Sequence, residues 1–180
     1  MSDTFKDYMI MAKKKTVHVT VTMAELLYDI SNETYLRGRM ADDGTNYRKV
    51  AYMFASMDAD NRDKILRSVK RAFAEVKTAV AEYLDESALS ADDILQDSPD
   101  DIALHLSMPG NYDEAATEGM AEAVHDYIRN TAVADWYLVT DKGDAADYAT
   151  LAARAMQSLR NAVNRRCRPT RPATATKAQG

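Results

Sequence analysis

Residues 16–40 read TVHVTVTMAELLYDISNETYLRGRM, and the spacing of their apolar side chains changes at Met23. Over residues 16–22 a valine stands at every second position, which predicts a strand with one buried face. From Met23 onward the apolar residues recur every three or four positions, so we predict an amphipathic helix that reaches about Met40. Thr22 and Glu25 match the capping-box pattern, in which the hydroxyl and the carboxylate each accept a hydrogen bond from a free backbone N–H.

Residues 101–108, DIALHLSM, alternate in the same way and are followed by the turn sequence PGN. Because a lone strand leaves its backbone groups without partners, we predict that Val17–Val21 pairs with Ile102–Leu106 in a two-stranded ribbon. His18 and His105 then become cross-strand neighbours on the face away from the core. No third ligand stands near them in the sequence, so we interpret them as a solvent-facing pair and predict no metal site.

Helical periodicity dominates the rest of the chain. The clearest apolar stripe spans residues 58–84, which we predict to be the longest helix, with Asp58 as its N-cap. Further helices are predicted at residues 46–57, 113–139 and 144–165. The fold class that follows is mainly α: a helical bundle of about four main helices with a small two-stranded β ribbon, its strands near 16–22 and 101–108.

The length of 180 residues fits one domain, and charge is distributed unevenly along it. We divide the chain into a mobile N-terminal arm (1–15), a single helical domain (16–165) with an acidic loop (85–101), and a disordered basic C-terminal tail (166–180). The formal net charge is −5, yet residues 161–180 hold five basic residues and no acid, and the loop holds seven acids and no base. Such opposite charges can pair within one molecule or between copies, and solvation of a loop and of the chain ends is the alternative interpretation.

The candidate interaction residues are therefore of two kinds. The arm and the tail contribute Lys13, Lys14, Lys15, Arg165, Arg166, Arg168 and Arg171. The acidic loop contributes Asp92, Asp93, Asp97, Asp100 and Asp101. The ten tyrosines and ten methionines are of types enriched at subunit interfaces, and ordinary core edges use them as well.

Motifs for catalysis and cofactor binding are missing from the sequence. It contains no GxxxxGKS/T or GxGxxG loop for phosphates, no HExxH or CxxC metal motif and no GxSxG nucleophile turn. We therefore expect no enzymatic activity, no cofactor and no metal. The single cysteine, Cys167, is interpreted as an exposed thiol in a reducing compartment. No apolar run approaches the roughly 20 residues of a membrane-spanning helix, and the first residues lack the pattern of a signal peptide.

Three stretches carry a resemblance to a known group of proteins. Glu25–Ile30 (ELLYDI), Asp135–Thr140 (DWYLVT) and Arg166–Pro172 (RCRPTRP) resemble small uncharacterised proteins of phages and prophages of Bacteroides-like bacteria. In that setting the helical architecture is similar to neck proteins of tailed phages, which include head–tail connectors, adaptors and completion proteins. The two predicted strands depart from the small all-helical connectors.

The resemblance implies a non-enzymatic virion structural protein, assembled in the cytoplasm of the bacterial host. Its expected partners are further copies of itself in a ring and neighbouring virion proteins such as portal or tail components, with no membrane. Contact with nucleic acid would be non-specific. The alternative is a cytoplasmic helical regulatory or nucleic-acid-associated module whose basic tail contacts phosphates.

Overall fold

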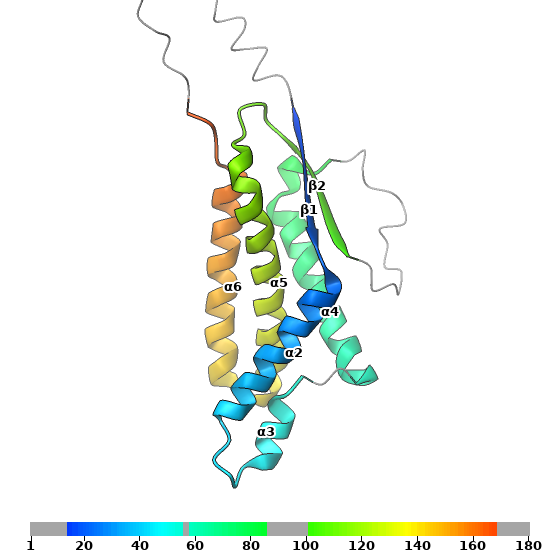
Figure 1. Ribbon diagram of the computed structural model, residues 1–180, viewed down its shortest axis with the longest axis vertical. Helices are drawn as coiled ribbons and strands as arrows, with labels where there is room; N and C mark the ends of the chain where they lie inside the picture. Colours follow the sequence, from blue (N-terminus) through cyan, green and yellow to red (C-terminus); the bar gives the residue numbers. More distant parts are fainter. Residues whose placement is uncertain (1–13, 56–57, 86–100, 169–180) are drawn as a thin grey trace, which may run out of the picture.

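In the computed structural model, which describes residues 14–55, 58–85 and 101–168, the two alternating segments form the antiparallel ribbon expected from the sequence (Figure 1). Strand β1 (Lys15–Val21) pairs with β2 (Ile102–Met108), so that Val21 faces Ile102 and His18 faces His105. The valine face of β1 and the leucine face of β2 are buried against the helices, because alternate side chains point to opposite sides of a sheet.

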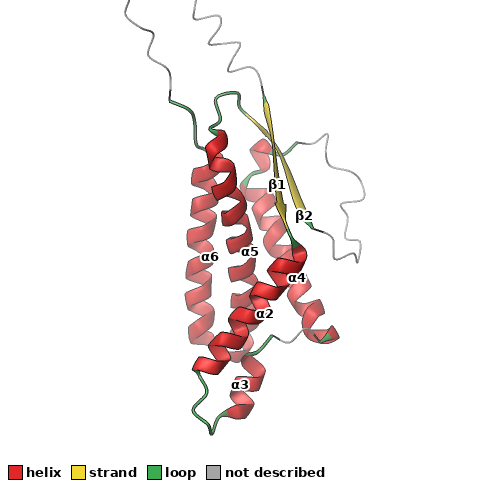
Figure 2. Cartoon of the chain, viewed as in Figure 1, coloured by secondary structure: helices red, strands yellow, loops and turns green. Residues whose placement is uncertain are grey.

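Five helices are described, and the prediction of a mainly helical bundle with a small ribbon is confirmed (Figure 2). Their bounds are α2 (Met23–Met40), α3 (Tyr47–Met53), α4 (Ala59–Ala79), α5 (Thr117–Thr140) and α6 (Lys142–Val163), with short 3-10 turns at Ala81–Tyr83 and Glu114–Ala116. Helix α5 is central: α6 and α4 pack on it, and α2, α3 and β1 contact it as well. Met120, Val124 and Ile128 of α5 are fully buried, as this central position requires.

Helices α5 and α6 form an antiparallel hairpin with Asp141 between them. The Asp141 side chain accepts hydrogen bonds from the N–H groups of Gly143 (3.1 Å) and Asp144 (3.5 Å), and so caps the start of α6. A hydrogen bond from Lys49, followed by the bond from the Asp144 N–H, lowers the pKa of Asp141 and keeps the cap charged. The buried face of α6 carries three alanines, Ala145, Ala152 and Ala155, which let the helices approach closely.

The longest helix is α5, with 24 residues, and the prediction for 58–84 was wrong on this point because α4 has 21 residues and ends at Ala79. After a 3-10 turn, Leu84 forms a single β-bridge with Leu106, and the Asp85 N–H donates to the His105 carbonyl at 3.1 Å. Leu84 and Asp85 therefore contact the ribbon, which they could not do if α4 continued to residue 84.

The capping-box prediction was also wrong. Thr22 does occupy the N-cap position of α2, but its side chain makes no cap hydrogen bond. The Met23 N–H instead donates to Oδ1 of Asp101 at 3.1 Å. The register of the ribbon explains why Asp101 takes the place of Thr22 as the capping acceptor. Val21 lies opposite Ile102, and this brings the adjacent Asp101 to the start of α2.

Residues just outside the predicted boundaries of 16 and 165 also make regular backbone contacts. Lys15 belongs to β1, Arg166 forms a β-bridge with Tyr112, and the Cys167 N–H donates to the carbonyl of Asn111 at 2.8 Å. The first residues of β1 and the end of α6 lie at the same end of the bundle (Figure 1). Within the described ranges, no helix combines the length and the apolar character needed to cross a membrane.

Candidate interaction surfaces

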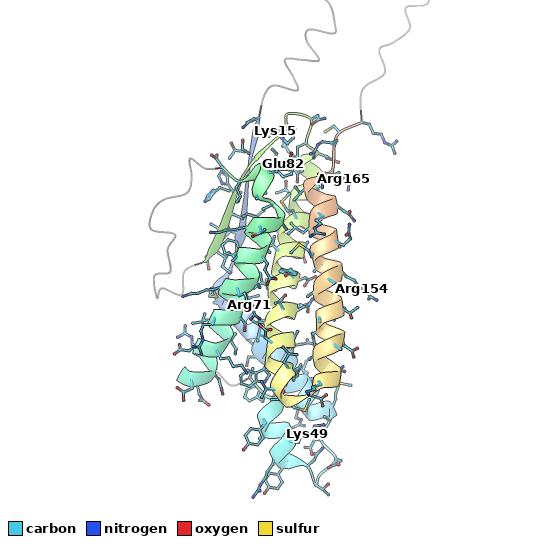
Figure 3. All side chains as sticks on the ribbon, turned by 180° about the vertical axis from the view of Figure 1, so that it is seen from behind. Lys15, Lys49, Arg71, Glu82, Arg154 and Arg165 are labelled. Atoms are coloured by element: carbon cyan, nitrogen blue, oxygen red, sulfur yellow. The ribbon has the colours of Figure 1, made fainter. Side chains whose placement is uncertain are left out.

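The described basic residues of the predicted arm and tail lie at one end of the bundle, which we call the basic end. Lys14, Lys15, Arg165, Arg166 and Arg168 are described, whereas Lys13 and Arg171 lie outside the described residues. Figure 3 labels Lys15 and Arg165 at this end, on β1 and just beyond α6. Because α6 is antiparallel to α5, it ends at the end of the bundle where β1 begins, and the basic residues of β1 therefore lie near those that follow α6.

Two of these cations are paired with acids of the loop before α5. The Lys15 ammonium lies 2.9 Å from Glu114 and donates to the Tyr112 carbonyl at 3.0 Å, and the hydrogen bond to Glu114 raises the pKa of Lys15. Arg165 donates to Asp113 at 2.9 Å. The positive charge of the basic end is therefore partly neutralised inside the same chain.

Arg166 is held by groups of the bundle. Its guanidinium donates to the Val163 carbonyl at 2.8 Å and to the Tyr83 hydroxyl at 3.1 Å, and it lies 5.8 Å from the centre of the Tyr83 ring. Such a side chain fastens the segment after α6 to the 3-10 turn after α4. We assign it a structural role in joining these two elements.

Of the predicted acidic set, only Asp101 is described, and it caps α2. Asp92, Asp93, Asp97 and Asp100 lie outside the described residues. The acids that pair with the basic residues, Asp113 and Glu114, were not predicted. Strand register could have indicated them, because β1 and β2 are antiparallel and Lys15 lies opposite Met108, just before the loop that carries both acids.

A second surface, absent from the predicted sites, lies at the opposite end of the bundle (Figure 1). Large apolar side chains are exposed there on α3, on the second half of α2 and on the last turn of α5; Met40 is 80% exposed, Val139 78% and Tyr52 71%. We call this surface the apolar end, and its residues are Tyr35, Leu36, Met40, Tyr47, Tyr52, Leu138 and Val139. Exposed apolar side chains that gather in one region mark interaction sites.

A groove of about 260 Å³ runs between α2 and α3 within the apolar end. Its walls include Tyr35 and Phe54, whose rings meet edge to face with centroids 5.7 Å apart. The two helices pack closely at Gly38, where a Cβ would lie in ordinary contact, 3.4 Å from the Val50 carbonyl oxygen. The two tyrosines of α3, Tyr47 and Tyr52, are exposed.

A wider hollow of about 700 Å³ opens between the start of α2 and the first half of α5. Its lining includes Glu25, Asp29, Glu118, Glu122 and His125, and His125 lies 3.4 Å from Asp29. Among the described residues no three histidine, cysteine, aspartate or glutamate side chains converge closely enough to hold a metal ion. The hollow is acidic and open, and we assign it no reaction.

Two tyrosines bridge the helices through carboxylates. Tyr127 of α5 donates to Glu75 of α4, and Tyr148 of α6 donates to Glu33 of α2. Burial first, and then the hydrogen bond to Glu75, raise the pKa of Tyr127 to about 12; burial and Glu33 raise the pKa of Tyr148 in the same order. Both hydroxyls stay protonated at neutral pH and act as donors between helices.

His18 and His105 are cross-strand neighbours, as predicted from the alternation of the two segments. Their Nδ1 atoms lie 2.6 Å apart on the exposed face of the ribbon. Cys167 is exposed, with its Sγ 3.5 Å from the Tyr112 carbonyl oxygen.

Comparison of the chain with family models, with curated proteins and with solved structures finds no match in any of the three.

Proposed function

We propose that this protein is a non-enzymatic structural subunit that acts by oligomeric assembly, as a head–tail connector, adaptor or tail-completion component of a tailed phage. The observation that carries the assembly role is the apolar end, where seven large apolar side chains are exposed. Tyrosine and methionine, which are enriched at protein interfaces, supply four of the seven. The phage context rests on the resemblance of residues 25–30, 135–140 and 166–172.

The difference between the two ends of the bundle supports head-to-tail assembly. The apolar end and the basic end lie at opposite ends of the bundle, so two different surfaces are available to two neighbours. Contacts between unlike surfaces close into rings when the rotation between subunits allows it. Residues 1–13 and 169–180 are attached at the basic end, and we infer that they contact neighbouring subunits.

The alternative of a nucleic-acid-binding module receives less support. Lys15 and Arg165 are paired with Glu114 and Asp113, and Arg166 is directed into the bundle. Phosphate binding requires cations that are free to face the backbone of a nucleic acid.

The assembly role is tested by measuring the molar mass of the purified chain by light scattering over a range of concentrations. We expect masses that are multiples of 20.1 kDa and grow with concentration. The double variant Tyr52→Glu with Val139→Glu places two charges in the apolar end and should weaken association by about tenfold or more. Tyr28→Glu is the matched control, because Tyr28 is 68% exposed but lies in the first half of α2, outside the apolar end.

Circular dichroism checks that each variant keeps its helices. A wild-type chain that stays monomeric at every concentration, alone and with its genomic neighbours, contradicts the assembly role. Equal association of the double variant and the wild type assigns the interface to another surface.

Raising the salt from about 0.05 to about 0.2 M separates the two proposed functions, since nucleic-acid binding through phosphates weakens steeply and apolar association does not. The phage role predicts the chain in purified tailed particles, detected by mass spectrometry.

A further inference from the structure

The outward face of the ribbon presents two histidines whose ring nitrogens point at each other. His18 and His105 occupy the same register position on β1 and β2, and their Nδ1 atoms lie 2.6 Å apart. The ring centroids are 4.7 Å apart and the planes meet at 77°. The flanking residues Val17, Val19, Leu104 and Leu106 are buried in the core, so the backbone beneath both rings is fixed.

This geometry requires an electron-poor partner between the two nitrogens. A hydrogen bond forms only when one Nδ1 carries the hydrogen and the other offers its lone pair. When both rings carry the hydrogen on Nε2, two lone pairs face each other across a short gap. Neutral imidazole nitrogen is a preferred ligand of Zn²⁺, Ni²⁺ and Cu²⁺.

We propose that His18 and His105 form a two-histidine binding site for a divalent first-row transition metal, with water completing the coordination. Metal–nitrogen bonds of about 2.0–2.1 Å place two neighbouring ligand nitrogens about 2.9 Å apart in square-planar geometry and about 3.3 Å apart in tetrahedral geometry. From their 2.6 Å distance, the two Nδ1 atoms need to separate by about 0.3 Å for square-planar and by about 0.7 Å for tetrahedral geometry. Rotation of the exposed rings supplies this movement while the strands stay in place.

The surroundings of the pair leave space for the ion and its waters. On β1 and β2 the neighbouring positions of the same face are small and uncharged: Thr16, Thr20, Ala103 and Ser107. Beside β2 lies one charged residue, Asp85, whose N–H donates to the His105 carbonyl at 3.1 Å. No cluster of three ligands exists in the described part of the chain, so the site is bidentate and its preference follows the Irving–Williams order, with Cu²⁺ bound most tightly. Binding to two neutral rings moves a hydrogen from Nδ1 to Nε2 of one ring and releases no proton.

A bound ion would join two segments that lie 87 residues apart in the sequence. It would hold β1 on β2 and thereby fix the start of β1, where Lys15 reaches Glu114. A ligand that binds only the folded ribbon raises the stability of the whole domain by mass action. The inference stands independently of the assembly role.

Isothermal titration calorimetry of the full chain with Zn²⁺, Ni²⁺ and Cu²⁺ salts tests the site. The wild type should bind one equivalent, reversibly on addition of a chelator. His18→Thr and His105→Thr keep β-branched residues in the strands, and each should weaken binding by about tenfold or more because the ion loses one of two protein ligands. His125→Gln and Cys167→Ser are the matched controls, since they remove the remaining histidine and the lone thiol.

The thermal midpoint of the wild type should rise with added metal, and that of the two threonine variants should not. Circular dichroism identifies any variant that fails to fold, and in that case NMR of the wild-type imidazole resonances decides: the signals of His18 and His105 should shift on metal addition and that of His125 should not. Three results overturn the proposal: no saturable binding by the wild type, unchanged affinity in either threonine variant, or affinity lost only in a control variant. The pair is then a hydrogen-bonded contact only.

Discussion

Replacing Thr34 by valine removes one buried hydroxyl and leaves the shape of the side chain unchanged. Thr34 of α2 is 0% exposed, and its Oγ1 accepts a hydrogen bond from the Ala55 N–H at 3.1 Å. The same hydroxyl donates to the carbonyls of Ile30 and Ser31, both at 3.0 Å. Ala55, which follows α3, is also 0% exposed, so its N–H has no water to replace the lost acceptor.

The expected cost of Thr34→Val is the penalty of one unsatisfied buried N–H. Such a group costs about 1–3 kcal/mol, and we expect a loss of about 2 kcal/mol in the free energy of unfolding. For a chain of this length, about 2 kcal/mol lowers the thermal midpoint by roughly 4–8 °C. Thr34→Ser keeps the acceptor and loses a methyl group, so the Ala55 N–H should stay protected in this variant.

Urea unfolding followed by the fluorescence of the only tryptophan measures the loss. Trp136 suits this purpose because its Nε1 donates to the Met53 carbonyl at 2.9 Å, two residues before Ala55. Hydrogen exchange of the Ala55 amide provides the specific readout, and it should accelerate in Thr34→Val but not in Thr34→Ser. Thr150→Val, at an exposed threonine of α6, is the control and should change stability by less than about 0.5 kcal/mol. Equal urea midpoints and equal Ala55 exchange in Thr34→Val and the wild type would refute this reasoning.

Two further predictions concern the start of α2 and the buried tyrosines. Asp101→Ala removes the acceptor of the Met23 N–H and should cost about 1 kcal/mol in urea unfolding, whereas Thr22→Ala should cost less than about 0.5 kcal/mol; the reverse order would restore the capping box. Tyr127, whose pKa is raised to about 12 mainly by burial and then by Glu75, should titrate late in an alkaline titration of tyrosinate absorbance, and Tyr127→Phe should remove one late-titrating group. Because the folded pKa of Tyr127 exceeds the unfolded value of about 10, the contribution of this tyrosine to stability is complete below pH 10 and is lost as the pH rises to about 12. If Tyr127→Phe instead removes an early-titrating group, the assignment is wrong.

The spacing of apolar residues along the chain was enough to predict the ribbon and α2. The alternation at 16–22 and 101–108 specifies which side chains face the core, and a shift of one residue would bury the histidines instead of the valines. The pairing of His18 with His105 could therefore be predicted. The cap of α2 was not predicted, because Asp101 is 78 residues from Met23 and the adjacent Thr22 fits the local capping pattern.

The apolar end was missed for a different reason. Periodicity identifies the inner face of a helix, and in α2 this face is marked by Leu26 and Ile30. It gives no information on whether Leu36 or Met40, on the other side, is covered by another element of the same chain. Their exposure depends on where α3 packs on α2, which the periodicity of either helix does not specify.

The central position of α5 has a consequence for the order in which the chain is made. Residues 15–79 leave the ribosome before α5, although Leu26 and Val69 bury their side chains in the core that α5 completes. Strand β1 also leaves the ribosome well before its partner β2. By contrast, α5 and α6 are joined by a single residue and can associate as soon as both have been synthesised. Residues 15–79 of the nascent chain therefore carry uncovered apolar faces until β2 and α5 have been synthesised.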